Sequence, residues 1–193
     1  MLTPREWSAI ALAACARRAV VCGGFDCYQQ LRRYETTEIL DITTEKWSRG
    51  SVMATGRDAC AAFAVDERCV LVAGGWDGRR ALATTELLDL DACACTPGPE
   101  LGAARMFCAG AALDGARCAL VVGGSSPGAL ATTELLDFAT MRFAPGPAMR
   151  ARREACAAVA LDARVHQINS AMTSNFACVI KLPASSLTRN TRK

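Results

Sequence analysis

The chain has 193 residues, of which 51% are hydrophobic and 21% are charged, and its formal net charge is +3. This composition is typical of a globular chain that can bury a core, and it excludes a disordered one. The positive excess lies in residues 166–193, which hold four basic and no acidic residues, so residues 1–165 carry 18 basic and 19 acidic side chains. Nucleic acid requires a concentrated basic face, so we expect no nucleic-acid partner.

Neither a membrane span nor an export signal is predicted. The apolar run 108–124 is interrupted by Asp114 and Arg117 and is too polar to cross a bilayer. The apolar stretch 7–16 follows Glu6 and is in register with stretches later in the chain, so we interpret it as a strand and not as a signal peptide. The chain has eleven cysteines, an odd number, which favours reduced thiols and a cytoplasmic location.

Four strands are predicted in the first 52 residues. The stretch after Trp7 forms the first strand, and the apolar run that ends in the doublet Gly23–Gly24 forms the second. After a polar loop, a third strand begins with the motif Thr-Thr-Glu at 36–38, and a short fourth strand runs through Trp47. No sustained helical period crosses these landmarks, which indicates an all-β unit.

The same landmarks return along the chain. Thr-Thr-Glu occurs again at 84–86 and 132–134, with a constant spacing of 48 residues. Three more residue types keep this spacing, namely Asp41, Asp89 and Asp137; Arg57, Arg105 and Arg153; and Cys60, Cys108 and Cys156. The apolar runs end in doublets at Gly23 and Gly24, at Gly74 and Gly75, and at Gly123 and Gly124. Repetition with a period between 20 and 50 residues indicates solenoids, propellers or arrays.

Four antiparallel strands in a unit of about 50 residues describe a propeller blade. The units resemble kelch repeats, in which an apolar run ends in Gly-Gly and an aromatic-Asp-Gly loop follows, as in Gly74–Gly78. A late Trp follows seven residues after an aromatic or apolar residue, as Trp47 follows Leu40. The resemblance implies kelch-type blades of four antiparallel strands, with Trp47 and Phe143 filling the space between blades.

We predict kelch repeats over residues 1–165, in units 1–52, 53–100 and 101–148 with a partial fourth unit at 149–165. Residues 166–193 have a different composition, rich in Asn, Ser, Thr and Lys, and are expected to form a divergent, flexible tail. Three complete units are fewer than the four to eight blades of closed propellers, so a partial or open propeller is expected. Open blade edges also lead us to expect self-association.

No catalytic, metal or cofactor site is predicted. The chain has one histidine, His166, whereas kelch-containing copper oxidases use paired histidines. Cys93 and Cys95 form a Cys-x-Cys pair, but zinc sites need a second pair of ligands. The carboxylates that recur in every unit, Asp41, Asp89 and Asp137 with Glu38, Glu86 and Glu134, are interpreted as structural groups that cap turns and pair with the repeated arginines.

The loops after the doublets are the candidate binding surface, because they vary while the scaffold positions repeat. They contain an aromatic and arginine mixture that is enriched at protein interfaces, namely Phe25, Tyr28, Arg32, Arg33, Trp76, Arg79 and Arg80, and Asp77 in the same loops is also predicted to bind the partner. In kelch propellers the residue after the doublet and the residue after the strand-opening Arg line the binding rim. By resemblance these are Phe25, Trp76 and Ser125, with Glu6, Asp58, Met106 and Glu154.

The sequence therefore predicts a non-catalytic protein–protein interaction module that binds a protein partner through the loops after the doublets. Two alternatives remain open. The first is the substrate-recognition part of a ubiquitin ligase adaptor, which rests on analogy at the level of the fold, and the second is a fragment of a propeller enzyme.

Overall fold

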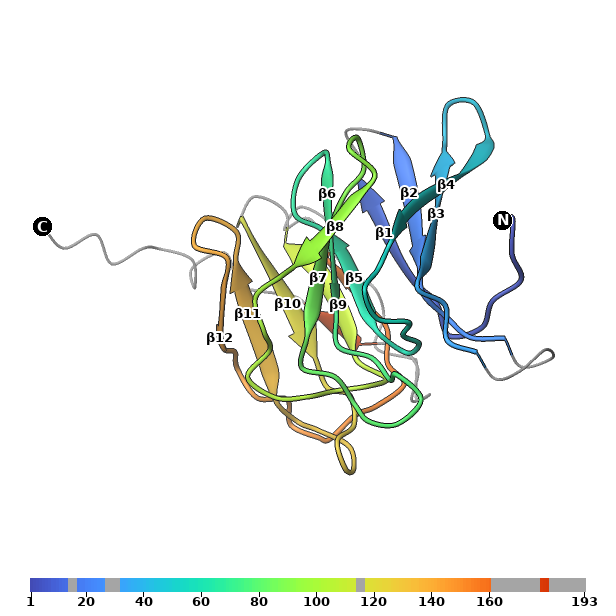
Figure 1. Cartoon of the computed structure of the whole chain (residues 1–193). Coiled ribbons are helices and arrows are strands. Elements are labelled where there is room, and N and C mark those ends of the chain that lie inside the picture. Colours follow the sequence, from blue (N-terminus) through green and yellow to red (C-terminus); the bar gives the residue numbers. More distant parts are fainter. Residues whose placement is uncertain (14–16, 27–31, 114–116, 161–177, 181–193) are drawn as a thin grey trace, which may run out of the picture.

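The computed structural model describes residues 1–13, 17–26, 32–113, 117–160 and 178–180 (Figure 1). Within these residues the secondary structure consists of strands without helices. Consequently, the part of the chain that is described contains no helix that could cross a membrane.

Twelve of the strands form three antiparallel sheets, each with its four strands in chain order. The first sheet contains β1 (Ala9–Ala13), β2 (Arg18–Cys22), β3 (Thr36–Asp41) and β4 (Lys46–Val52). The second contains β5 (Ala61–Ala64), β6 (Cys69–Ala73), β7 (Thr85–Asp89) and β8 (Ala94–Pro97). The third contains β9 (Ala109–Leu113), β10 (Cys118–Val122), β11 (Thr133–Asp137) and β12 (Arg142–Pro145). The predicted all-β fold of four-stranded antiparallel blades is confirmed.

The apolar runs before the doublets form the second strand of each sheet. They are apolar on both of their faces because both faces are covered. In β6, Val70 and Val72 pack toward the first sheet, whereas Leu71 packs toward the third, and all three are completely buried. Burying one such aliphatic side chain stabilises the fold by about 2 kcal/mol. The cores therefore lie between successive sheets.

The first strand of each sheet is its innermost strand, and these inner strands pack against one another from sheet to sheet. Figure 1 shows the three sheets side by side. In each sheet the strand farthest from the inner strand, β4, β8 or β12, is the other edge strand, and no sheet closes into a barrel. Small residues allow this approach, because a Cβ on Gly110 in β9 would lie 2.9 Å from the ring of Phe63 in β5. The arrangement is that of a partial all-β propeller.

A fourth unit begins after the third sheet. Strand β13 (Ala158–Ala160) packs against β9 and pairs in parallel with β14 (Cys178–Ile180), with Ala158 opposite Cys178. This parallel pairing differs from the antiparallel meander of the first three sheets, and the sequence after β13 contains no glycine doublet and no Thr-Thr-Glu motif. The unit boundaries and the separate segment 166–193 stay predictions, and most of that segment lies outside the described residues.

Candidate functional site

The glycine doublets join each sheet to the next. Gly23 and Gly24 have φ values of +63° and +96°, and a Cβ on Gly23 would lie 2.1 Å from the carbonyl oxygen of Arg57. The N–H of Gly24 donates to the same oxygen at 2.9 Å. The second glycine of each later doublet repeats this bond, Gly75 to Arg105 at 2.8 Å and Gly124 to Arg153 at 2.9 Å. Both positions therefore require glycine, for backbone conformation and for space.

A buried ion pair supports the first two of these junctions, at Arg57 and at Arg105. The guanidinium of Arg57, fully buried, lies 2.6 Å from an oxygen of Glu86 and donates to the carbonyl oxygens of Gly74 and Thr84, both at 2.9 Å. Glu86 also accepts the backbone N–H of Ala54 at 2.6 Å. Burial alone would raise the pKa of Glu86, but hydrogen bonds from Cys95 and Ala54 and the charge of Arg57 hold this pKa below its ordinary value.

The same pair occurs in the other two sheets. Nη2 of Arg5 lies 2.7 Å from Oε1 of Glu38, and Nη2 of Arg105 lies 2.6 Å from Oε1 of Glu134. All four side chains are buried. The predicted pairing of the repeated glutamates and arginines is confirmed, and these groups belong to the scaffold and not to the rim. Arg153 differs, because its side chain is exposed, although its backbone N–H donates to Leu130 just as that of Arg105 donates to Leu82.

The repeated aspartates cap turns, as predicted. One carboxylate oxygen of Asp41 accepts the backbone N–H groups of Thr43 and Thr44, at 2.8 and 2.9 Å. Asp89 and Asp137 each accept the two equivalent N–H groups in their own sheets. These turns lie at the end of the sheets opposite the doublets, because antiparallel neighbours reverse the direction of the chain.

At the doublet end, backbone hydrogen bonds join the rim residues of each sheet in one pair. Asp58 and Trp76 exchange N–H to O bonds of 3.1 and 2.9 Å. Glu6 and Phe25 do the same in the first sheet, and Met106 and Ser125 in the third. The residues after the doublets and the residues after the strand-opening arginines therefore lie together, at one end of the sheets.

Five of the predicted rim residues meet in one open hollow of about 320 Å³. Its walls are formed by Trp7, Phe25, Arg33, Asp58, Trp76, Met106 and Phe107. Trp7 and Phe107 were missed by the sequence reasoning, although both stand at one repeat position, two residues after the strand-opening arginine. A chain of backbone bonds of 2.8 to 2.9 Å links that position from sheet to sheet, through Trp7, Ala59, Phe107 and Ala155.

The polar wall of the hollow is an ion pair between two sheets. Nε of Arg33 donates to a carboxylate oxygen of Asp58 at 3.0 Å, and the Arg33 guanidinium lies 5.4 Å from the centre of the Phe25 ring. Burial raises the pKa of Asp58, and the charge and hydrogen bond of Arg33 oppose that rise. The pair therefore holds a desolvated carboxylate beside aromatic rings.

The remaining predicted residues lie outside the hollow. Ser125 is only 5% exposed and offers little surface. Arg32 is exposed and pairs with Glu35. In the loop of the second sheet, Asp77 accepts the backbone N–H groups of Arg79 and Arg80, and both arginine side chains extend into solvent. Glu154 is exposed, and Tyr28 lies outside the described residues.

Comparison with known proteins agrees with this geometry. Residues 59–102 match the Kelch motif. This segment is a kelch repeat. It spans all four strands of the second sheet, and the three four-stranded sheets are consistent with kelch blades, so the resemblance drawn from the sequence is confirmed. No curated protein matches the chain.

The positions between neighbouring sheets are filled unevenly. Phe143 packs into the core between the second and third sheets. Cys95, at the equivalent position of the second sheet, packs between the first and second sheets and donates its S–H to Glu86 at 3.0 Å. The thiol therefore serves the scaffold, and burial, with the bond to Glu86, raises its pKa to about 12.

The repeated thiols are unsuited to nucleophilic chemistry. Cys60 and Cys108 are buried, and burial raises their pKa values to about 11 and about 12. A thiol with such a pKa is protonated at neutral pH, whereas the thiolate is the reactive form. In the described part of the chain, no group of three or more His, Cys, Asp or Glu side chains could hold a metal ion.

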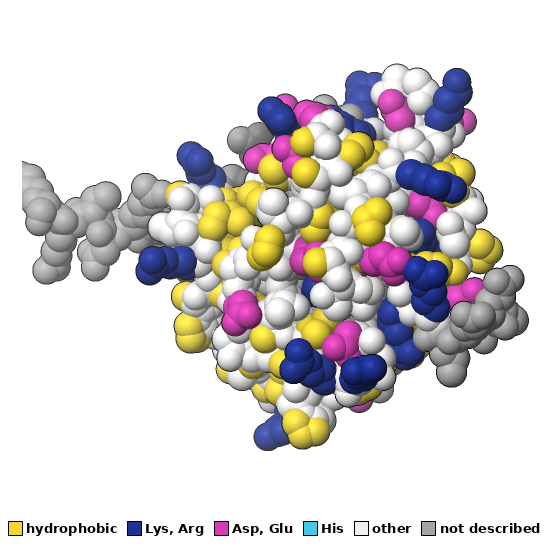
Figure 2. Space-filling view, in the orientation of Figure 1, with side chains coloured by type: hydrophobic (Ala, Val, Ile, Leu, Met, Phe, Trp, Pro, Cys, Tyr) yellow, Lys and Arg dark blue, Asp and Glu magenta, His cyan; other side chains and the backbone are white. Residues whose placement is uncertain are grey.

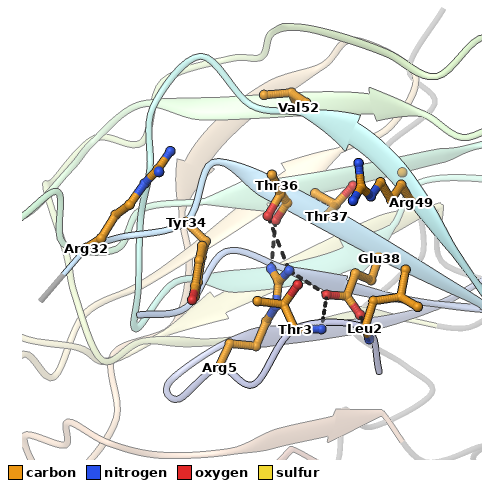
Figure 3. A pocket seen from close by; sticks show the side chains of 11 residues that line it. Leu2, Thr3, Arg5, Arg32, Tyr34, Thr36, Thr37, Glu38, Arg49 and Val52 are labelled. Carbon is orange, nitrogen blue, oxygen red and sulfur yellow. Dashed lines mark hydrogen bonds and ion pairs between the residues drawn. The ribbon is translucent and has the colours of Figure 1, made fainter. Parts of the chain in front are cut away.

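A second cavity, of about 390 Å³, lies beside the ion pair of the first blade. Figure 3 shows the guanidinium of Arg5 between Thr36 and Glu38, and Glu38 in turn accepts the backbone N–H groups of Leu2 and Thr3. These hydrogen bonds join the groups of the cavity floor to one another, so the cavity exposes scaffold and not a reactive group. Figure 2 shows acidic and basic side chains interspersed over the visible face of the molecule.

Proposed function

We propose that this chain is a non-catalytic protein-interaction module that holds a protein partner on the rim at the doublet end of its kelch blades. The single observation that carries the proposal is the hollow to which three blades contribute Phe25, Arg33, Asp58, Trp76 and Met106. Kelch repeats generally mediate protein interactions, which supports the same reading.

The construction of the rim suits this role. Its loops differ in length and chemistry from blade to blade, whereas the doublets and buried ion pairs beneath them are repeated. A rigid scaffold that carries variable loops is the usual way to build a binding surface. Trp76 and Arg33 also belong to the residue types that supply most of the binding energy at protein interfaces.

The proposal is tested by a pull-down with the double variant Trp76→Ala, Arg79→Ala. Aromatic and arginine anchors at interfaces lose about 2 kcal/mol or more on truncation, so the variant should retain at most a few per cent of the partner at unchanged thermal stability. The control variant Arg117→Ala, Arg142→Ala removes two exposed arginines from the opposite end of the blades and should bind normally. Equal retention by both variants would contradict the proposed surface.

A further inference from the structure

The hollow in the rim has the composition of an aromatic cage. Four of its seven wall residues are Trp or Phe, contributed by three different blades. The rings of Trp7 and Phe107 meet edge to face, with centroids 5.0 Å apart and planes at 73°. Trp7 is 53% exposed, so its ring is open to an incoming group. The negative faces of such rings attract organic cations.

A carboxylate completes the cage. The side chain of Asp58 is only 8% exposed, and within the described residues the Nε of Arg33 is its sole hydrogen-bond donor. The bond from Arg33 reaches Oδ2 alone, which leaves the acceptor capacity of Oδ1 to a ligand. Glu6 adds a second negative charge on the same rim, because its backbone is bound to Phe25 in the wall.

Three kinds of occupant can be compared on these grounds. An anion would meet the Asp58 carboxylate, and the cation of the hollow, Arg33, is already bound to that carboxylate. A neutral apolar side chain would cover Asp58 and leave one of its oxygens desolvated without a donor, which is costly. A cation with an alkyl stem would lie against the rings and offset the charge of the carboxylate, and an ammonium that retains an N–H would also donate to Oδ1.

Arg33 shows that the walls accept such a group. Its guanidinium lies 5.4 Å from the centre of the Phe25 ring and donates to Asp58, so aromatic and carboxylate contacts are made by one cation of the chain itself. With a volume of about 320 Å³, the remaining space is at the small end of ligand pockets and suits one side chain.

We propose that the hollow binds the alkylammonium group of a lysine side chain, unmodified or N-methylated, that a partner protein presents to the rim. This inference rests on the proposed function only for the source of the lysine. The binding chemistry belongs to Trp7, Phe107, Trp76 and Asp58 and can be measured without any partner.

The test uses small probes. Nα-acetyl-lysine methylamide and its Nε-trimethyl derivative are titrated into the full chain, with Nα-acetyl-norleucine methylamide as the neutral probe of similar shape. The indole N–H signals of Trp7, Trp47 and Trp76 report binding in ¹H–¹⁵N NMR spectra. We expect saturable shifts for Trp7 and Trp76 and not for Trp47, and at least roughly tenfold weaker binding of the norleucine probe, because the cationic contacts are then lost.

Two variants decide the role of the walls. Asp58→Asn should weaken binding of the lysine probes at least about tenfold, whereas the control Asp66→Asn, in an exposed turn at the opposite end, should leave it unchanged. If Asp58→Asn lowers the thermal midpoint, Trp7→Leu replaces it, because Trp7 is largely exposed and its loss removes one ring of the cage. The inference would be overturned if the norleucine probe bound as tightly as the lysine probes, if binding did not saturate, or if the variant bound the lysine probes unchanged. None of these outcomes would alter the result of the pull-down, so the proposed function is tested separately.

Discussion

The glycine doublets allow a prediction in which backbone conformation and packing are separated. Gly75 and Gly128 have nearly the same φ, +103° and +98°. A Cβ on Gly75 would lie 2.6 Å from the carbonyl oxygen of Asp58 and 2.9 Å from the Cβ of Cys60, whereas a Cβ on Gly128 would meet nothing within 4 Å. Replacement of each glycine by alanine therefore places the same group in two different surroundings.

The expected magnitudes follow from this contrast. Each alanine holds a strained backbone conformation, which costs on the order of 1–3 kcal/mol, and each also reduces the conformational freedom of the unfolded chain. Both effects are common to the two variants, so they cancel when the stability of one variant is compared with that of the other. Gly75→Ala in addition disturbs the 2.8 Å bond from Gly75 to Arg105, worth about 1 kcal/mol, and overpacks the junction by about 1–3 kcal/mol. Gly75→Ala should therefore lower the free energy of unfolding by about 2 kcal/mol or more beyond Gly128→Ala.

Urea denaturation followed by tryptophan fluorescence measures both variants under identical conditions. The predicted result is a midpoint for Gly128→Ala moderately below that of the original chain and a clearly lower midpoint for Gly75→Ala. Equal losses in the two variants would refute the view that the doublets are needed for the close approach of neighbouring blades.

Three further predictions concern the scaffold, the thiols and the exposed face of the first blade. Glu86→Gln breaks a buried ion pair and should lower the free energy of unfolding by about 3–5 kcal/mol at neutral pH. Because the pKa of Glu86 is lowered in the folded state, the stabilisation by its carboxylate is complete above the ordinary pKa of a glutamate and is lost as the pH falls through the lowered pKa. On acidification below about pH 5 the original chain should therefore lose more stability than the variant. All eleven cysteines should react with a thiol reagent in denaturant without prior reduction, and a deficit that reductant restores would show disulfides and contradict a cytoplasmic location. Ile10 and Leu12 are 65% and 55% exposed, although Ala62, at the repeat position of Ile10, is buried between blades. The chain should therefore self-associate through this exposed apolar face in sedimentation experiments, and the variant Ile10→Ser, Leu12→Ser should not. A monomer at all concentrations of the original chain would contradict this prediction.

Repetition explains how much of the fold could be predicted. A residue that recurs at one position of every unit must serve a role that every unit needs, so the glycine doublets, the buried Arg57–Glu86 pair and the turn-capping Asp41 were all found from their spacing. Asp58 and Trp76 were placed on one rim only by resemblance to kelch propellers, and their backbone hydrogen bonds were found in the structure.

The parts that vary between units were not predictable in the same way. Trp7 and Phe107 share a repeat position with Ala59 and Ala155, so no residue type marked that position as part of the hollow. Ser125 follows a doublet as Phe25 and Trp76 do, and its position in the repeat did not indicate that it is buried. The parallel pairing of β13 with β14 joins segments without a common pattern, and a register between such segments is set by tertiary packing alone.

The central claim is that a partner protein binds at the doublet end of the blades. Its most direct test is photo-crosslinking in cells with p-benzoyl-phenylalanine placed at Trp76, in the wall of the hollow, and at Arg117, at the opposite end. The account predicts that the Trp76 position forms a covalent adduct with one defined protein and that the Arg117 position does not. The same adduct from Arg117, with none from Trp76, would contradict it.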